Sequence, residues 1–173
     1  NNVPIIIVSN HQSMWDISPI TWYLRKYHPK FISKVELGKG IPSVSYNLRH
    51  GGSILIDRKN SRQAIVEMVK FSKYLQKFKR SGVIFPEGTR SKTGVPKPFR
   101  RTGLQTLFKK VPDGYVIPVT FNNSWKLQRW GMFPMQMGVR LEMTAHPAIK
   151  IADYEVETLI DKVEEIITSK IHK

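Results

Sequence analysis

The sequence predicts a single α/β domain, in which a mostly parallel or mixed β-sheet is flanked by helices. Three observations predict this class. Short apolar runs alternate along the chain with longer segments of helical periodicity, as in domains built on one sheet. The 173 residues are 40% hydrophobic, which is enough for one sizeable core. No repeat, low-complexity tract or linker divides residues 1–173, so we expect one domain.

The strands are expected where short apolar runs are bounded by turn residues. The first run, 3–9, is rich in β-branched residues, which is typical of a strand buried on both faces. The strand 115–121 contains Pro118, which has no N–H for a ladder, so we expect an edge strand or a bulge there. The predicted strands are 3–9, 30–33, 53–56, 82–85, 115–121 and 139–145.

The helices are expected where apolar residues recur every three or four positions. Ser18 followed by Pro19 predicts a helix start, because Pro is tolerated at the first helical position. The segment 61–80 is both amphipathic and basic. The predicted helices are 18–27, a short one ending at Arg49 after a turn at 38–42, 61–80, 102–110 and 154–171.

Charge is distributed unevenly along the chain. The net charge at pH 7 is +15, and residues 58–110 carry fifteen Lys or Arg against two acids. Residues 153–165 carry six acids and one Lys. A concentrated basic field predicts a polyanionic partner, which is nucleic acid, an anionic bilayer surface or a phosphorylated substrate.

Several absences narrow the kinds of site. The chain has no Cys and no His-Glu-x-x-His spacing, so we expect neither disulfides nor a metal site. No apolar run approaches the ~20 residues of a membrane-spanning helix. The chain starts at Asn1, directly before a strand and without an initiator Met, so we expect an N-terminal segment to be missing from it.

A loop with several polar groups follows the predicted strand 82–85. It is Phe85-Pro86-Glu87-Gly88-Thr89-Arg90-Ser91. Ligand sites collect where the strands of an α/β sheet end. A carboxylate, a hydroxyl, a guanidinium and a glycine that admits close backbone approach suit a phosphate ester with a nearby hydroxyl. A capped surface turn is the alternative for this loop alone.

His11 follows the first predicted strand, and Asp16 lies five residues further on. A carboxylate bonded to one imidazole nitrogen fixes the tautomer and leaves the other nitrogen as a general base. Ser13 is a possible nucleophile, although its spacing does not establish a hydrogen bond to His11. No Gly-x-Ser-x-Gly turn and no Cys accompany this histidine, so we expect the substrate to supply the attacking hydroxyl.

Four blocks occur in order along the chain. They are Asn10-His11-x-Ser13-x-x-Asp16, Gly52-x-x-x-Ile56-Asp57-Arg58, Phe85-Pro86-Glu87-Gly88-Thr89-Arg90-Ser91 and Ile117-Pro118-Val119. With them the chain resembles the glycerolipid acyltransferases, the family of the bacterial 1-acyl-sn-glycerol-3-phosphate acyltransferases. The resemblance covers about 3–121, depends mainly on the first and third blocks, and also fits Lys34-x-Glu36-Leu37.

The resemblance implies an O-acyltransferase that uses acyl-CoA or acyl-carrier protein (acyl-ACP) as co-substrate, with no other cofactor and no metal. His11 is then the catalytic base and Asp16 its orienting partner. The implied substrate-binding residues are Glu87, Gly88, Thr89 and Arg90, with Arg58 and Lys34 adding positive charge for the phosphate. The expected acceptor is lysophosphatidate, which gives phosphatidic acid; glycerol 3-phosphate or another lysophospholipid is the alternative.

Two other classes of protein remain as alternatives. One is a nucleic-acid-binding module that uses residues 58–110, although no helix-turn-helix, zinc-finger or RNP pattern is present. The other is a lipid-binding domain without catalysis, against which the intact His11 and Asp16 argue. The acyltransferase interpretation predicts an anionic membrane surface as partner, no nucleic acid, and a location at the cytoplasmic face of the membrane, peripheral or anchored through the missing segment.

Two parts of the chain are candidates for membrane docking. The first is the basic face of 61–80 together with the basic residues Arg100, Arg101, Lys109 and Lys110. The second is the segment 125–137, which is rich in Trp, Met and Phe. For that segment we favour core packing of a bent strand, so we expect charge to do most of the docking.

Overall fold

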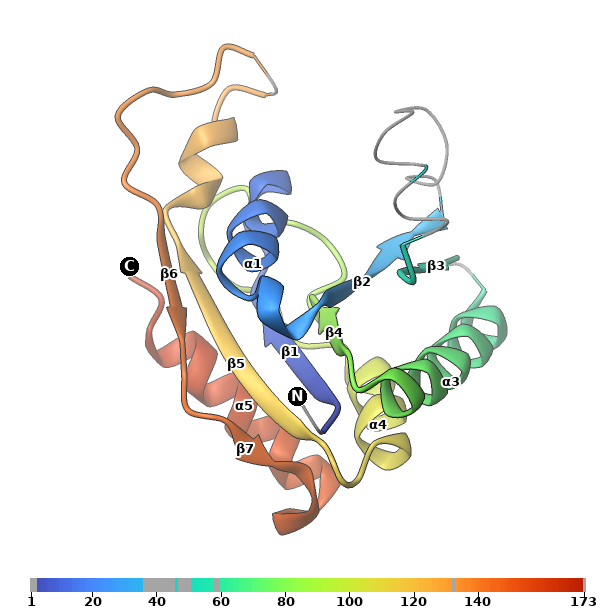
Figure 1. Cartoon of the computed structure of the whole chain (residues 1–173). Helices are drawn as coiled ribbons and strands as arrows, with labels where there is room; N and C mark the ends of the chain where they lie inside the picture. The colour runs from blue at the N-terminus through green and yellow to red at the C-terminus, as the bar shows by residue number, and fades with distance from the viewer. Residues whose placement is uncertain (1–2, 36–45, 47–50, 58–59, 132, 173) are drawn as a thin grey trace.

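A mixed β-sheet runs through the centre of the computed structural model, which describes residues 3–35, 46, 51–57, 60–131 and 133–172. Within these residues the sheet has seven strands in the order β3-β2-β4-β1-β5-β6, and β7 also pairs with β5 (Figure 1). The pairs from β3 to β5 are parallel, while β6 and β7 are antiparallel to β5. The strands are β1 (Ile5–Ser9), β2 (Pro29–Lys34), β3 (Ile54–Ile56), β4 (Ser81–Ile84), β5 (Tyr115–Asn122), β6 (Glu142–Ala145) and β7 (Ile149–Lys150).

Helices cover both faces of this sheet. Alternate residues of β1 point to opposite faces: Ile6 packs in a core with residues of α3, α4 and α5, whereas Ile7 packs in a second core with Ile20 of α1. The α-helices are α1 (Ile17–Tyr23), α3 (Ser61–Phe78), α4 (Arg101–Lys110) and α5 (Val156–Ser169). The short 3₁₀ helices are η1 (Met14–Asp16), η2 (Arg25–Tyr27), η4 (Ser124–Gln128) and η5 (Ile151–Asp153). The predicted fold class is confirmed.

The first helix begins earlier than its sequence predicts. The Ser13 hydroxyl accepts a hydrogen bond from the Trp15 N–H, and the Asp16 carboxylate accepts one from the Ser13 N–H. This reciprocal pair caps η1, which runs directly into α1. The prediction that the helix starts at Ser18, with this residue as its N-cap, was therefore wrong, because the cap at Ser13 starts the helical turn five residues upstream.

Pro118 does not lie on an edge strand. β5 has β1 on one side and both β6 and β7 on the other. Val116 and Val119 are three residues apart on β5, but the residues paired with them, Ile149 of β7 and Ala145 of β6, are four residues apart. The missing N–H of Pro118 faces this break. The prediction of an edge strand was wrong. The pairing is irregular at Pro118, but the extra residue lies between β6 and β7 and not in β5.

The segment 125–137 is largely exposed. Trp130 is 62% exposed, Phe133 79% and Met137 93%, whereas Trp125 is half-buried against Gly94. The prediction that this segment packs in the core was therefore wrong for its later part. The chain leaves the sheet after β5 and returns to it only at β6. The loop projects at the upper end of the molecule in Figure 1.

Most other predicted elements are confirmed, and two predictions lie mostly or wholly outside the described residues. The strands and helices predicted at 30–33, 53–56, 61–80, 102–110 and 154–171 are present within a few residues of these bounds. The turn predicted at 38–42 and most of the helix ending at Arg49 lie outside the described residues. None of the helices in the described part of the chain combines the length and apolar character needed to cross a bilayer.

Candidate active site

The site lies where β1 and β4 end side by side. These parallel strands pair Val8 with Ile84, so the loops that follow them start at the same edge of the sheet. The two loops meet directly. The His11 ring stacks on the Phe85 ring, with centroids 4.1 Å apart and planes inclined by 21°.

The loop after β1 forms the predicted histidine–carboxylate pair. His11 Nδ1 lies 2.9 Å from Asp16 Oδ2. The same oxygen accepts hydrogen bonds from the backbone N–H groups of Gln12 (2.8 Å) and Ser13 (2.9 Å). Asp16 is buried, and the His11 side chain retains 15% exposure. The carboxylate is thus fixed by its own loop, and it fixes the orientation of the imidazole.

The second ring nitrogen of His11 is available. No described residue bonds to its Nε2, so a bound hydroxyl can approach it. Asp16 Oδ1 is buried without a hydrogen-bond partner among the described residues. The Asp16 carboxylate therefore keeps one acceptor oxygen on the ring nitrogen Nδ1, while Nε2 faces away from it.

Ser13 is not placed as a nucleophile. Its Oγ donates a hydrogen bond to Gln128 Oε1 at 3.0 Å and accepts one from the Trp15 N–H at 3.3 Å. No hydrogen bond joins Ser13 Oγ to His11. The geometry therefore does not support Ser13 as a nucleophile activated by His11.

Glu87 joins the two loops. Its Oε1 accepts a hydrogen bond from the His11 N–H (2.8 Å), and its Oε2 accepts one from the Lys97 N–H (2.9 Å). The residue is 2% exposed. Burial raises the pKa of the Glu87 carboxyl, and the two backbone N–H groups oppose this by lowering it. Glu87 thus holds the backbone of His11 in place, while its assignment to substrate binding stays a prediction.

Gly88, Thr89 and Arg90 turn outward from this anchor. Gly88 has φ +71°, and a Cβ there would lie 3.1 Å from Arg100 Nε, so both conformation and space favour glycine. Thr89 and Arg90 are exposed at the same sheet edge. Lys34 is exposed at the end of β2, the strand next to β4.

The residues predicted to bind substrate are therefore not all described. Lys34, Gly88, Thr89 and Arg90 are placed at this edge of the sheet, with Glu87 buried beneath them. Arg58 lies outside the described residues, two positions after the end of β3. The binding roles of these residues stay predictions.

Gln128 is a site residue that the sequence did not reveal. Its Oε1 accepts hydrogen bonds from Ser13 Oγ (3.0 Å), Met14 N (3.2 Å) and Arg90 Nη1 (3.3 Å). One amide oxygen therefore connects the loop after β1, the loop after β4 and η4. The chain separation from Gln128 to Ser13 is 115 residues, and no motif marks it.

An apolar cavity adjoins the stacked His11 and Phe85 rings. It has a volume of about 230 Å³, and Phe85 forms part of its wall. Arg100 and Gly88 also contribute to the lining, so one charged residue borders the apolar space. The apolar residues that line it include Ile32, Ile56, Ile65, Met68 and Ile84. An aliphatic chain fits such a lining.

These features place a partly buried histidine–carboxylate pair at one edge of an α/β sheet, with a basic loop and an apolar cavity beside it. The model of the acyltransferase family matches residues 1–122, which is more than half of the chain. The chain belongs to this family, and the predicted resemblance is confirmed.

Several curated relatives share one name, 1-acyl-sn-glycerol-3-phosphate acyltransferase. The protein of that name from Helicobacter pylori (strain J99) is 46% identical over 92 residues, covering 51% of this chain and 36% of the relative. The chloroplastic protein of that name, BAT2, from Brassica napus is 35% identical over 133 residues, covering 76% of this chain and 36% of the relative. The chain thus spans little more than a third of the length of these two relatives.

Relatives that cover nearly the whole chain are more distant. The Borreliella burgdorferi protein of the same name is 27% identical over 177 residues, covering 98% of this chain and 68% of the relative. The crystal structure of the 1-acyl-sn-glycerophosphate acyltransferase PlsC from Thermotoga maritima matches with a TM-score of 0.75 at 26% identity. That match covers 99% of this chain and 66% of PlsC, so the fold extends through the region beyond residue 122.

Proposed function

We propose that this chain transfers a fatty acyl group from an acyl thioester to the free hydroxyl of 1-acyl-sn-glycerol 3-phosphate, giving phosphatidic acid. The hydrogen bond between His11 Nδ1 and Asp16 Oδ2 carries this proposal, because it leaves Nε2 of a partly exposed imidazole as a base. The shared name of the curated relatives supports the choice of reaction and acceptor.

The reaction balances with the groups present. Nε2 of His11 takes the proton of the acceptor hydroxyl as its oxygen bonds to the thioester carbonyl carbon. The buried Asp16 carboxylate stabilises the imidazolium that results. The tetrahedral intermediate then collapses, the carbon–sulfur bond breaks, and the imidazolium returns the proton to the leaving thiolate. The proposed reaction uses acyl-CoA or acyl-ACP as co-substrate and needs no metal or other cofactor.

The proposed acceptor site lies on the loop after β4. Arg90 and Thr89 are exposed there, and a guanidinium forms strong charge-assisted hydrogen bonds with a phosphate. Lys34 adds positive charge from the end of β2, and we expect Arg58, which lies outside the described residues, to add charge as well. The adjoining apolar cavity supports an acceptor or donor with an aliphatic chain. Glycerol 3-phosphate and other lysophospholipids are the alternative acceptors.

An anionic membrane surface is the proposed partner, at the cytoplasmic face. The net charge of +15 supports an anionic surface, and an acceptor with a long acyl chain resides in a bilayer. We do not expect nucleic acid as a partner. Retention of the protein on anionic liposomes and on DNA at matched salt distinguishes the two, since only liposomes should retain it strongly.

Product analysis tests the proposed function directly. The purified chain is incubated with acyl-CoA or acyl-ACP and with lysophosphatidate, glycerol 3-phosphate or lysophosphatidylcholine, and the products are identified by mass. Phosphatidic acid should form with lysophosphatidate, and it should not form with a His11→Ala variant. A folded wild-type chain that acylates none of these acceptors would contradict the proposal.

A further inference from the structure

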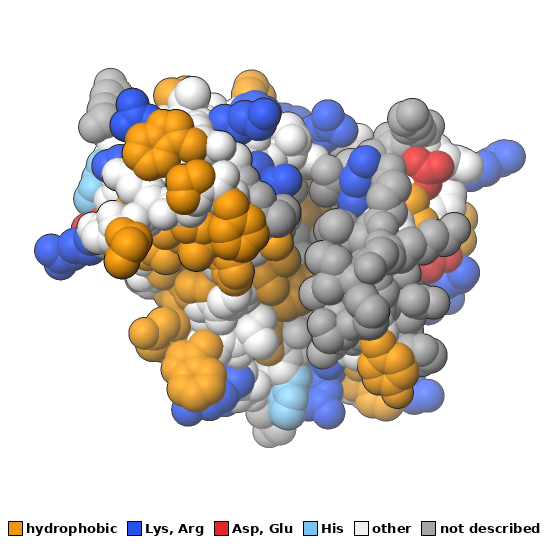
Figure 2. Space-filling view, turned by 90° about the horizontal axis from the view of Figure 1, so that it is seen from above, with side chains coloured by type: hydrophobic (Ala, Val, Ile, Leu, Met, Phe, Trp, Pro, Cys, Tyr) orange, Lys and Arg blue, Asp and Glu red, His pale blue; other side chains and the backbone are white. Residues whose placement is uncertain are grey.

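Large apolar side chains are exposed on two segments that lie far apart in the sequence. In the segment around η1 and α1, Trp22 is 64% exposed and Tyr23 is 67% exposed. In the loop after η4, Trp130, Phe133 and Met137 are still more exposed on average. Figure 2 views the molecule from the end where α1 and η4 lie in Figure 1, and it shows hydrophobic side chains gathered over one side of this end.

The two segments are physically joined beside the catalytic loop. Gln128, the last residue of η4, accepts hydrogen bonds from Ser13 and Met14, which start η1. We call the exposed apolar side chains on the joined segments the aromatic face. Its members are Trp15, Trp22, Tyr23, Trp130, Phe133 and Met137.

The segments 17–35 and 123–141, which carry most of the aromatic face, are basic, and Glu142 directly after them pairs with Arg140 at 3.7 Å. Residues 17–35 and 123–141 contain no Asp or Glu. Their seven basic residues are Arg25, Lys26, Lys30, Lys34, Lys126, Arg129 and Arg140. Arg25 lies over the Trp22 ring at 5.0 Å, and Arg129 lies over the Trp130 ring at 5.9 Å. Aromatic rings with cations beside them are typical of protein surfaces at the boundary between lipid headgroups and acyl chains.

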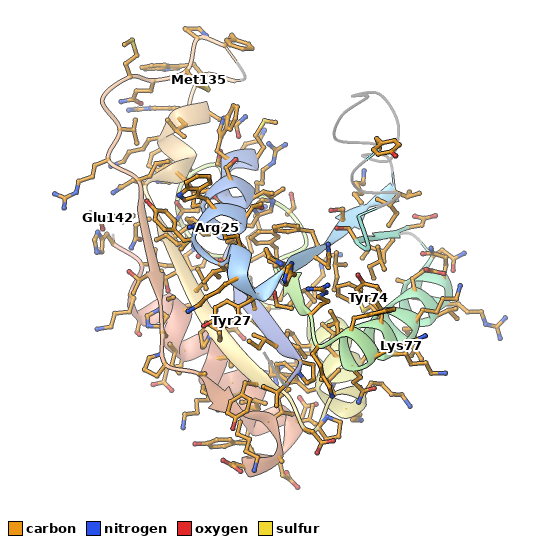
Figure 3. The ribbon with its side chains drawn as sticks, viewed as in Figure 1. Arg25, Tyr27, Tyr74, Lys77, Met135 and Glu142 are labelled. Carbon is orange, nitrogen blue, oxygen red and sulfur yellow. The ribbon has the colours of Figure 1, made fainter. Side chains whose placement is uncertain are left out.

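Most of the opposite charges lie elsewhere. Six acids occur from Asp153 to Glu165, four of them on α5, which packs along one face of the sheet with its C-terminal end beside Asn122 of β5 (Figure 1). The basic helix α3 is also separate from the aromatic face. Figure 3 shows Lys77 on α3 at one side of the molecule and Met135, in the loop after η4, at the opposite corner.

We propose that the aromatic face is the surface by which this domain docks on an anionic bilayer. Trp130, Phe133 and Met137 enter the interfacial layer, and the surrounding cations contact the headgroups. The charges fit an anionic surface. The most exposed apolar residues lie on a projecting loop, which fits a deformable interface better than the concave binding surface of another protein. This inference rests on the proposed function in one respect, because that function requires an acceptor that resides in the bilayer.

The docking surface differs from the one that charge along the sequence suggested. The sequence ranked the basic face of 61–80 first and the aromatic segment second. In the structure, the segments of the aromatic face carry their own cations and lie next to His11 through Ser13 and Met14. Docking there would bring the histidine close to an acceptor held in the bilayer.

Vesicle binding of the chain tests the proposal without any substrate. The variant Trp130→Ser, Phe133→Ser, Met137→Ser removes three exposed apolar groups, and its affinity for vesicles of neutral and anionic phospholipid should fall by about tenfold or more. The matched control is Val66→Ser, Phe78→Ser on α3, where the side chains are 47% and 48% exposed, and it should bind as wild type. Lipid bromine atoms should quench Trp130 in a variant that has no other Trp.

Charge reversal separates the two candidate surfaces. Arg25→Glu with Arg129→Glu should weaken binding to anionic vesicles more than Lys73→Glu with Lys77→Glu on α3 does. The reverse order, or wild-type binding by the triple Ser variant, would overturn the proposal. Loss of acyl-carrier-protein binding by the triple Ser variant, with vesicle binding intact, would assign the face to a protein partner and also overturn it.

A short-chain acceptor that stays monomeric in water separates this inference from the proposed function. The triple Ser variant should acylate it at the wild-type rate, because none of the three residues lies in the site. Failure of the wild type to acylate any acceptor would contradict the function and leave the vesicle result to decide the surface independently.

Discussion

The loops after β1 and β4 both end at the candidate site, but they are stabilised in different ways. In the loop after β1, the Asp16 carboxylate bonds to His11 and to two backbone N–H groups, all within five residues. In the loop after β4, Glu87 bonds across 76 residues to the His11 N–H, and Arg90 bonds across 38 residues to Gln128.

This difference suggests a division of roles. The loop after β1 carries the proposed base, whose side chain is oriented by Asp16 of the same loop, so changes in this pair should alter the rate of the chemical step. The loop after β4 presents an exposed arginine whose position depends on remote residues, so changes there should alter acceptor binding. Four predictions test this division, in order of decreasing effect.

The largest effect is expected from the loop after β1. His11→Ala should lower kcat by about 10²–10⁴-fold, because general-base assistance is lost. Asp16→Asn should leave the fold intact and slow the reaction severely, since the imidazole loses its orienting charge. Thermal unfolding confirms folding, and His28→Ala serves as a control histidine that is exposed and remote from the site. Near wild-type turnover by folded His11→Ala would contradict the mechanism.

The loop after β4 should show its effect in acceptor KM. Arg90→Ala should raise the KM for lysophosphatidate by about 10- to 150-fold, which corresponds to ~1.5–3 kcal/mol for a lost charged hydrogen bond. Arg58→Ala should act in the same direction, and Lys92→Ala is the matched control in the exposed loop. A monoacylglycerol without phosphate should be a poor acceptor for all variants. Equal losses with both acceptors would remove Arg90 from the phosphate site.

Gln128 sharpens the comparison because it links the two loops. Gln128→Leu should raise acceptor KM by about 2- to 10-fold, because the long, exposed hydrogen bond that positions the Arg90 guanidinium is lost. Gln128→Glu retains an acceptor oxygen and should restore part of the loss. In an Arg90→Ala background, Gln128→Leu should add little. Additive losses in KM would show that Gln128 acts on binding through some other group.

The smallest effect concerns the pH dependence of stability. Burial raises the pKa of Glu87 above its ordinary value of 4.5. The Glu87 carboxyl group therefore binds its proton more tightly in the folded state than in the unfolded state. Its contribution to the free energy of unfolding falls as pH rises from 4.5 through the raised pKa. Glu87→Gln lacks that fall. The unfolding temperature of Glu87→Gln, measured relative to wild type, should therefore rise over this pH range. A difference between the two proteins that stays constant from pH 4 to 7 would contradict the raised pKa of Glu87.

The sequence by itself determined the fold class and the pairing of His11 with Asp16. Alternating apolar runs predict a sheet with helices because burial follows the period of each element. The pairing of His11 with Asp16 was predictable because the hydrogen bonds that make it are local. The block from Phe85 to Ser91 was placed correctly at the end of a buried strand for the same reason.

Tertiary structure alone decided which remote groups hold the site and which apolar groups stay exposed. Glu87 and Gln128 meet the catalytic loop only because β1, β4 and β5 lie side by side, and no local pattern encodes such long contacts. The neighbouring strands also decided that Pro118 lies inside the sheet. The segment after η4 has the composition of a core, yet its later residues have no layer to pack against, because the helices that cover the sheet lie elsewhere. Composition determines how strongly a side chain favours burial, and the arrangement of helices and strands determines which residues it contacts.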